Sequence, residues 1–373
     1  MRKSGLLAFG LSVLCAVNSV WAWGGKEHIQ LTRLAIERIV ADPQAPQGLK
    51  DWLKENTPDL MTLEQERAWF MSAHIGGDQR DDLKGFSYWV IQPDVRAAED
   101  RKQEKANQPQ KPVPPLNVAE QYWHFIDMEY LNDEIEKRAY HHDLSTMPDI
   151  KKAPRDIKDS RYKESGVLPF AVEASYKELV EHLKDGKLNP PADNLKDEDN
   201  ALKWGAQLCH YLEDNTQPLH GTQDYKCASY FENRLRAPNV HGQVEYAMND
   251  DEKHDYPKLR ADYWAEFAKD LKNDKDPIGT DDLWFNTLQV SLTNYKTIPL
   301  IGLAAMAATK EGGTPDHPQG KTQPFDTEAF FRFKSNVLGY ETTYLEVKAH
   351  QQAWAVLRCE KLLRKAWEDA QKK

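Results

Sequence analysis

Residues 201–220 read ALKWGAQLCHYLEDNTQPLH, and this stretch predicts both a helix and a group of metal ligands. From residue 201 to 212 the apolar side chains recur at helical spacing, through Leu202, Trp204, Leu208 and Tyr211. Pro218 cannot continue a helix, so we expect the helix to end before it. His210 and Asp214 are four positions apart and therefore project from one face of that helix.

Helical spacing also dominates the rest of the chain. Apolar residues recur with this period over residues 29–41, 170–183, 328–338 and 346–367. We find no clear run of alternating strand residues and no internal repeat. The sequence therefore predicts an all-α fold, with residues 23–373 as one large helical domain.

Three segments interrupt this helical pattern. Residues 94–115 are charged and then rich in Gln and Pro, while residues 274–282 and 312–323 are rich in Gly, Pro and Asp. Such compositions are typical of exposed, irregular chain. We interpret them, including the whole of residues 83–117, as long loop insertions in the helical domain.

The overall composition is that of an ordinary soluble protein. Of 373 residues, 40% are hydrophobic and 29% are charged, which excludes a disordered or membrane-embedded chain. The net charge of −10 leaves no broad basic surface for duplex nucleic acid. The amphipathic stretch 346–367 carries Trp354 and Trp367; we expect it to pack on the core, with membrane-surface binding as the alternative.

The N-terminus has the pattern of a secretory signal peptide. Met1-Arg2-Lys3 is positively charged, residues 5–17 are apolar, and Val20 and Ala22 stand at the −3 and −1 positions of a cleavage site. The apolar run is too short to span a bilayer. We expect cleavage after Ala22 and a secreted or periplasmic product, whose three cysteines allow one disulfide at most.

More candidate ligands follow the pair formed by His210 and Asp214. His220 comes six residues after Asp214, and His241 and Glu245 form a second pair at four-residue spacing. Imidazole nitrogens and carboxylate oxygens are common ligands of zinc. A single such pair is more often a hydrogen-bonded surface pair, but this combination favours a metal cluster.

The region before residue 201 adds further candidates. After cleavage Trp23 would begin the chain, and its α-amine and carbonyl could chelate a metal together with the nearby His28; alternatively, Trp23 is only a hydrophobic residue at a new terminus. The segment YWHFID, residues 122–127, places His124 among aromatic residues. The segment IGGDQR, residues 75–80, offers Asp78 after two glycines.

Together these motifs resemble the zinc-dependent phospholipase C and S1/P1 nuclease superfamily. The resemblance rests on Trp23 with a nearby His, an Asp, the HFxD block, the H-x3-D-x5-H run and the closing H-x3-[DE]. It extends from Trp23 to Glu245, and beyond that the match is only in helical character. It implies a helical domain that binds three zinc ions and hydrolyses phosphoric esters.

The resemblance also implies the ligands of each zinc ion. The first would be held by Asp78, His124, His210 and Asp214. The second would be held by the amine and carbonyl of Trp23, by His28 and by the other oxygen of Asp214. The third would be held by His220, His241 and Glu245. Asp78 would in addition orient the attacking water, and we find no motif for a protein nucleophile.

The sequence mixes features of the two branches of this superfamily. The spacing of Trp23 and His28 resembles that of the nucleases. In the nucleases, the residues at the positions of Phe125 and Asp127 bind a base. In this chain, Arg80 could contact a phosphate. Glu245 is instead the ligand type of the phospholipases. We therefore predict a monomeric nuclease that cleaves single-stranded nucleic acid to 5′-phosphorylated products. The alternatives are a phospholipase C acting on phosphatidylcholine-like lipids and a non-catalytic secreted zinc protein; no protein partner is implied.

Overall fold

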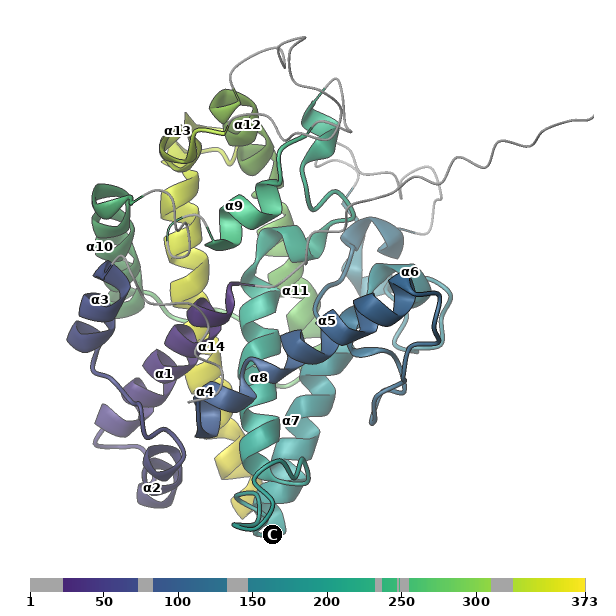
Figure 1. The fold of residues 1–373 in the computed structure, drawn as a ribbon, viewed down its shortest axis with the longest axis vertical. Coiled ribbons are helices and arrows are strands. Elements are labelled where there is room, and N and C mark those ends of the chain that lie inside the picture. The colour runs from purple at the N-terminus through teal and green to yellow at the C-terminus, as the bar shows by residue number, and fades with distance from the viewer. Residues whose placement is uncertain are drawn as a thin grey trace, which may run out of the picture.

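The computed structural model describes residues 23–72, 83–132, 147–231, 237–246, 248, 255–309 and 325–372. These residues are mostly helical, which confirms the predicted all-α class (Figure 1). The α-helices are α1 (Gly25–Ala41), α2 (Gln47–Glu55), α3 (Leu63–Met71), α4 (Gly85–Trp89), α5 (Gln92–Lys105), α6 (Tyr162–Ser165), α7 (Leu168–Lys184), α8 (Ala201–Thr216), α9 (Val240–Tyr246), α10 (Pro257–Asn273), α11 (Leu283–Tyr295), α12 (Ile298–Ala308), α13 (Thr327–Arg332) and α14 (Tyr344–Gln371).

Shorter elements link these helices. The 3-10 helices are η2 (Glu120–Tyr122), η3 (Met128–Leu131), η6 (Ile150–Lys152), η7 (Pro218–Gly221) and η8 (Ala228–Tyr230). In the described part of the chain, the strands are β1 (Lys334–Ser335) and β2 (Thr342–Thr343), which pair in antiparallel register. The predicted signal peptide, Asp78, Arg80 and all of residues 312–323 lie outside the described residues.

Two predictions from the sequence pattern were wrong. Part of the predicted exposed segment 94–115 is helix α5, which begins with Pro93 in its first turn and buries Asp94 and Ala97. The helix predicted over 328–338 ends at Arg332, because β1 follows it and the chain turns at Gly339, whose φ is +86°. A turn with positive φ is compatible with glycine but not with a continuing helix.

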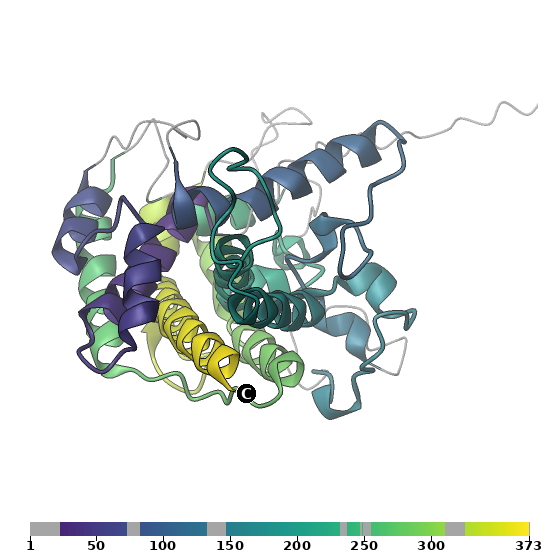
Figure 2. The same ribbon diagram turned by 90° about the horizontal axis from the view of Figure 1, so that it is seen from below.

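Helix α8 lies at the centre of the bundle. Every one of its residues is buried, and it packs against α1, α4, α7, α11 and α14. Its start is capped by Asn200, whose side chain accepts from the backbone N–H of Lys203. Figure 2 shows α7, α8 and α14 side by side and nearly end-on, with α5 crossing the bundle. Charged side chains on a helix enclosed in this way need compensating contacts.

The C-terminal helix α14 is a core helix. It contacts α1, α7, α8 and α10, and Trp354 is 5% exposed. Its long contact surface agrees with the expectation that it packs on the core. Buried apolar residues of the described chain form one continuous core. Every helix in that part is too short or too polar to span a bilayer.

The segment 124–127 is held in place by backbone hydrogen bonds. The N–H of Ile126 donates to the carbonyl of His220 at 2.9 Å, and the N–H of Asp127 donates to Ser165 at 2.7 Å. Gly166 adopts a φ of +79° directly against the carbonyl of Phe125. The junction between α6 and α7 therefore fixes the position of the HFxD block.

Gly166→Ala should destabilise the protein strongly. A Cβ at this residue would lie 2.2 Å from the carbonyl oxygen of Phe125. Gly186 is a matched control, since its φ is +71° and nothing lies within 4 Å of its Cβ position. We expect Gly166→Ala to lower the free energy of unfolding by about 2 kcal/mol more than Gly186→Ala. Urea titrations of both variants measure the difference, and equal losses would contradict the described contact.

Candidate metal centre

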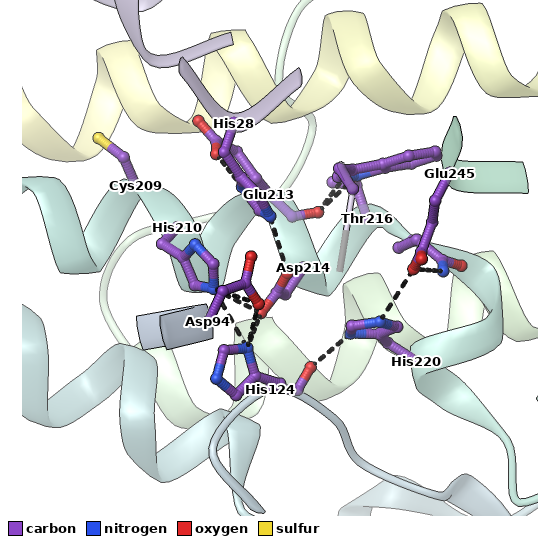
Figure 3. A network of polar contacts seen from close by, with 12 residues as sticks. His28, Asp94, His124, Cys209, His210, Glu213, Asp214, Thr216, His220 and Glu245 are labelled. Carbon is purple, nitrogen blue, oxygen red and sulfur yellow. Dashed lines mark hydrogen bonds and ion pairs between the residues drawn. The ribbon is translucent and has the colours of Figure 1, made fainter. Parts of the chain in front are cut away.

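The first ligand group is built on α8. His210 and Asp214 are both fully buried, and His210 Nε2 lies 3.3 Å from Asp214 Oδ2. His28 reaches this pair from α1: its Nε2 lies 3.5 Å from Asp214 Oδ1, and its ring stacks on that of His210 with centroids 4.1 Å apart. The two oxygens of Asp214 thus face different imidazoles, an arrangement compatible with a carboxylate that bridges two ions (Figure 3).

His124 and Asp94 complete this side of the cluster. His124 Nδ1 lies 2.9 Å from Asp214 Oδ2 and 3.1 Å from His210 Nε2. Asp94 Oδ1 lies 3.8 Å from His124 Nδ1 and 3.9 Å from His210 Nε2. Asp94, His124 and His210 therefore form one group of possible metal ligands, and Asp214 adjoins it through both histidines. Their nitrogen and oxygen atoms are donor types that zinc accepts.

A second group of ligands lies beside the first. His241 and Glu245 on α9 face His220 on η7, with Glu245 Oε1 at 3.1 Å from His241 Nε2 and 3.7 Å from His220 Nε2. The ring of His220 is oriented by its Nδ1, which lies 2.7 Å from the carbonyl oxygen of His124. Because the Nδ1–H donates there, Nε2 is left to bind a metal.

Trp23 lies next to the same helix. It is fully buried, and its indole Nε1 donates to the carbonyl of Glu213 at 2.8 Å. This contact brings the predicted mature N-terminus close to Asp214. Chelation by the amine and carbonyl of Trp23 stays a prediction.

The electrostatics of the cluster fit a cation. Among the described residues, His28 Nε2, Asp214 Oδ1 and Glu245 Oε2 are buried and make no hydrogen bond. Burial raises the pKa of Asp214 and of Glu245 well above the usual range of carboxyls. Burial and the neighbouring histidines lower the pKa of His28 and, likewise, of His124. A divalent cation would satisfy these atoms and favour the ionised carboxylates.

The structure adds Asp94 as a ligand candidate that the sequence reasoning missed. Asp78, to which that role was assigned, lies outside the described residues, as does Arg80. Asp94 is only 1% exposed and follows the apolar run Trp89-Val90-Ile91. A carboxylate three residues after such a run and directly after Pro93 marks the buried start of a helix, which is the signal that could have identified Asp94.

A cavity of about 490 Å³ opens beside the cluster. The ligands His124 and His220 line one part of it, and Phe125, Asp127 and Tyr122 line another. The structure therefore brings together the predicted substrate residues Phe125 and Asp127 with two of the predicted metal ligands.

Arg101 supplies positive charge to the cavity wall. It follows Asp94 by seven residues on α5 and so lies on the same face of that helix. Its Nη2 is buried and makes no hydrogen bond to the described residues. The sequence reasoning did not select Arg101, because residues 94–115 were interpreted as exposed loop.

No protein-family model matches the chain, and comparison with the curated proteins finds no relative. The functional interpretation therefore rests on the residues and distances described above. Ten of the residues assigned from the sequence fall within the described chain, and they gather around α8 and the adjoining cavity: Trp23, His28, His124, Phe125, Asp127, His210, Asp214, His220, His241 and Glu245.

Asp94→Asn should lower by one the number of metal ions that the cluster binds, because an amide oxygen is a weaker, uncharged ligand. Asp100→Asn is the control on the same helix, since Asp100 accepts from the backbone N–H of Gln121, away from the cluster. Metal analysis after dialysis should give one ion fewer for Asp94→Asn than for the unaltered chain and no loss for Asp100→Asn. Asp78→Asn compares the two assignments: loss of zinc there, with full binding in Asp94→Asn, would contradict the role of Asp94.

Proposed function

We propose that the chain beginning at Trp23 is a secreted, zinc-dependent phosphodiester hydrolase that cleaves single-stranded nucleic acid to 5′-phosphorylated products. The observation that carries this proposal is the convergence of two buried ligand groups next to a cavity with an aromatic and a carboxyl lining. His124 and His220 belong both to the ligand groups and to the cavity wall. A substrate in the cavity would therefore reach the metal centre directly.

The ligand residues would hold three zinc ions. Asp94, His124, His210 and Asp214 would hold the first, His28, Trp23 and Asp214 the second, and His220, His241 and Glu245 the third. When bound, zinc supplies Lewis-acid chemistry, which activates water and neutralises charge on the phosphate.

The side chains of the cavity would position the substrate. The Phe125 ring offers a face on which an unpaired base can stack. Arg101 offers an N–H donor to an oxygen of the phosphodiester, with a charge-assisted hydrogen bond as the result.

Asp127 favours a base over a cationic lipid headgroup. Burial and the nearby Glu129 raise the pKa of Asp127 well above its usual range. The carboxyl lies where it can hydrogen-bond to the edge of a base, and a raised pKa disfavours the fixed negative charge that would attract a cationic headgroup. A choline headgroup, by contrast, is bound best by aromatic faces and negative charge.

The phospholipase C alternative depends on Glu245, the ligand type found in that branch. In the structure Glu245 contacts both His220 and His241, so the alternative keeps a ligand set compatible with it. A purely structural zinc site is less compatible with the geometry, since structural sites are closed and two of these ligands line a cavity.

Product analysis separates these functions. The zinc-loaded protein with Trp23 at its N-terminus is offered single-stranded RNA and, separately, phosphatidylcholine vesicles. We expect 5′-nucleotides from the RNA and no product after treatment with a chelator. Release of phosphocholine instead would favour phospholipase C, and three bound zinc ions without either product would reject both activities.

Phe125→Ala should raise KM for single-stranded RNA by about tenfold or more, because stacking of a base is worth roughly 1–3 kcal/mol. Tyr88→Ala, on a ring that lies outside the cavity lining, is the control. Steady-state kinetics on both variants measure the effect. An unchanged KM in Phe125→Ala would remove this residue from the substrate site.

A further inference from the structure

Glu213 is a buried carboxylate that the proposed metal ligands do not include. It precedes Asp214 on α8 and is fully buried. Its Oε2 lies 2.5 Å from Nδ1 of His28, the ring nitrogen opposite to the one that faces Asp214. Figure 3 shows Glu213 on the far side of His28 from the other ligands.

The contact suits an imidazole that binds a metal through Nε2. Such a neutral ring carries its proton on Nδ1, and an oxygen of Glu213 lies where it can accept a hydrogen bond from that N–H. The lone pair of the neutral ring is then on Nε2, which lies 3.5 Å from Asp214 Oδ1. This is the nitrogen that faces the proposed metal.

Glu213 is itself held by other groups. The hydroxyl of Thr32 donates to its Oε1 at 2.8 Å, and Cys359 Sγ lies 3.9 Å from the same oxygen. Thr32 is one turn after His28 on α1, so a single helix presents both groups to the carboxylate. One oxygen of Glu213 therefore faces Thr32 and the other faces Nδ1 of His28, on the side of the ring away from Asp214.

We propose that Glu213 is a positioning residue that fixes the tautomer and orientation of His28 and thereby strengthens zinc binding at that site. The inference rests on the proposed function for the presence of zinc, and it goes beyond it by assigning a role to a residue outside the ligand set. Loss of such a carboxylate partner behind a histidine ligand commonly lowers metal affinity about 10–100-fold.

The test measures zinc affinity and metal-free stability in the same variants of the chain that begins at Trp23. Glu213→Leu removes the acceptor, Glu213→Gln keeps an oxygen that can accept from His28, and Thr32→Val removes the donor that holds Glu213. Gln207→Leu is the matched control, because Gln207 is buried on α8 and hydrogen-bonds to Tyr211 and Glu120. Zinc affinities come from competition with a chelator, and stabilities from urea unfolding of the metal-free proteins.

We expect Glu213→Leu to weaken one of three zinc sites about 10–100-fold and to leave the other two unchanged. Glu213→Gln and Thr32→Val should show smaller losses at that same site, and Gln207→Leu none. If Glu213→Leu does not fold, the zinc affinities of Glu213→Gln and Thr32→Val still decide whether Glu213 supports that site.

Two results would overturn the inference. Unchanged zinc affinity in the Glu213 variants, with a loss only of metal-free stability, would assign Glu213 a structural role and leave the proposed function standing. Failure of the wild-type chain to bind zinc at all would overturn both proposals.

Discussion

The structure depends on one electrostatic constraint, the enclosure of the Asp214 carboxylate among three imidazoles inside the helical bundle. Its oxygens lie 2.9 Å from His124 Nδ1, 3.3 Å from His210 Nε2 and 3.5 Å from His28 Nε2. A buried carboxylate is costly without compensation, and burial raises its pKa accordingly. A divalent cation, if bound as proposed, would supply this compensation and would account for His210 and Asp214 on a helix that is buried on every side.

The same constraint connects the cluster to the cavity. The carbonyl of His220 accepts a hydrogen bond from the N–H of Ile126, and Nδ1 of the His220 ring lies at hydrogen-bond distance from the carbonyl of His124. These reciprocal bonds make the HFxD block and η7 one unit. The same stretch of backbone therefore places Phe125 and Asp127 at the cavity and His124 and His220 in the cluster of candidate ligands.

Four of the long helices were predicted from the sequence because their apolar residues recur with a strong helical period, whereas α10, α11 and α12 were not assigned. The helices around residues 29–41, 170–183, 201–212 and 346–367 are all present as α1, α7, α8 and α14. Helix α5 was missed, since its many charged residues gave no apolar stripe and its single buried turn is set by contacts with α4, η2 and α8. Asp94 was missed with it, and Arg101 for the same reason.

The sequence by itself determined the all-α class, the apolar faces of the long helices and a set of candidate ligands at four-residue spacings, because helical period and local spacing are encoded in neighbouring residues. Only the tertiary structure decided that Asp94 joins His124 across 30 positions of sequence and that Glu213 meets His28 from another helix. Such meetings depend on how helices cross, and no local pattern specifies the distance between side chains that belong to different helices.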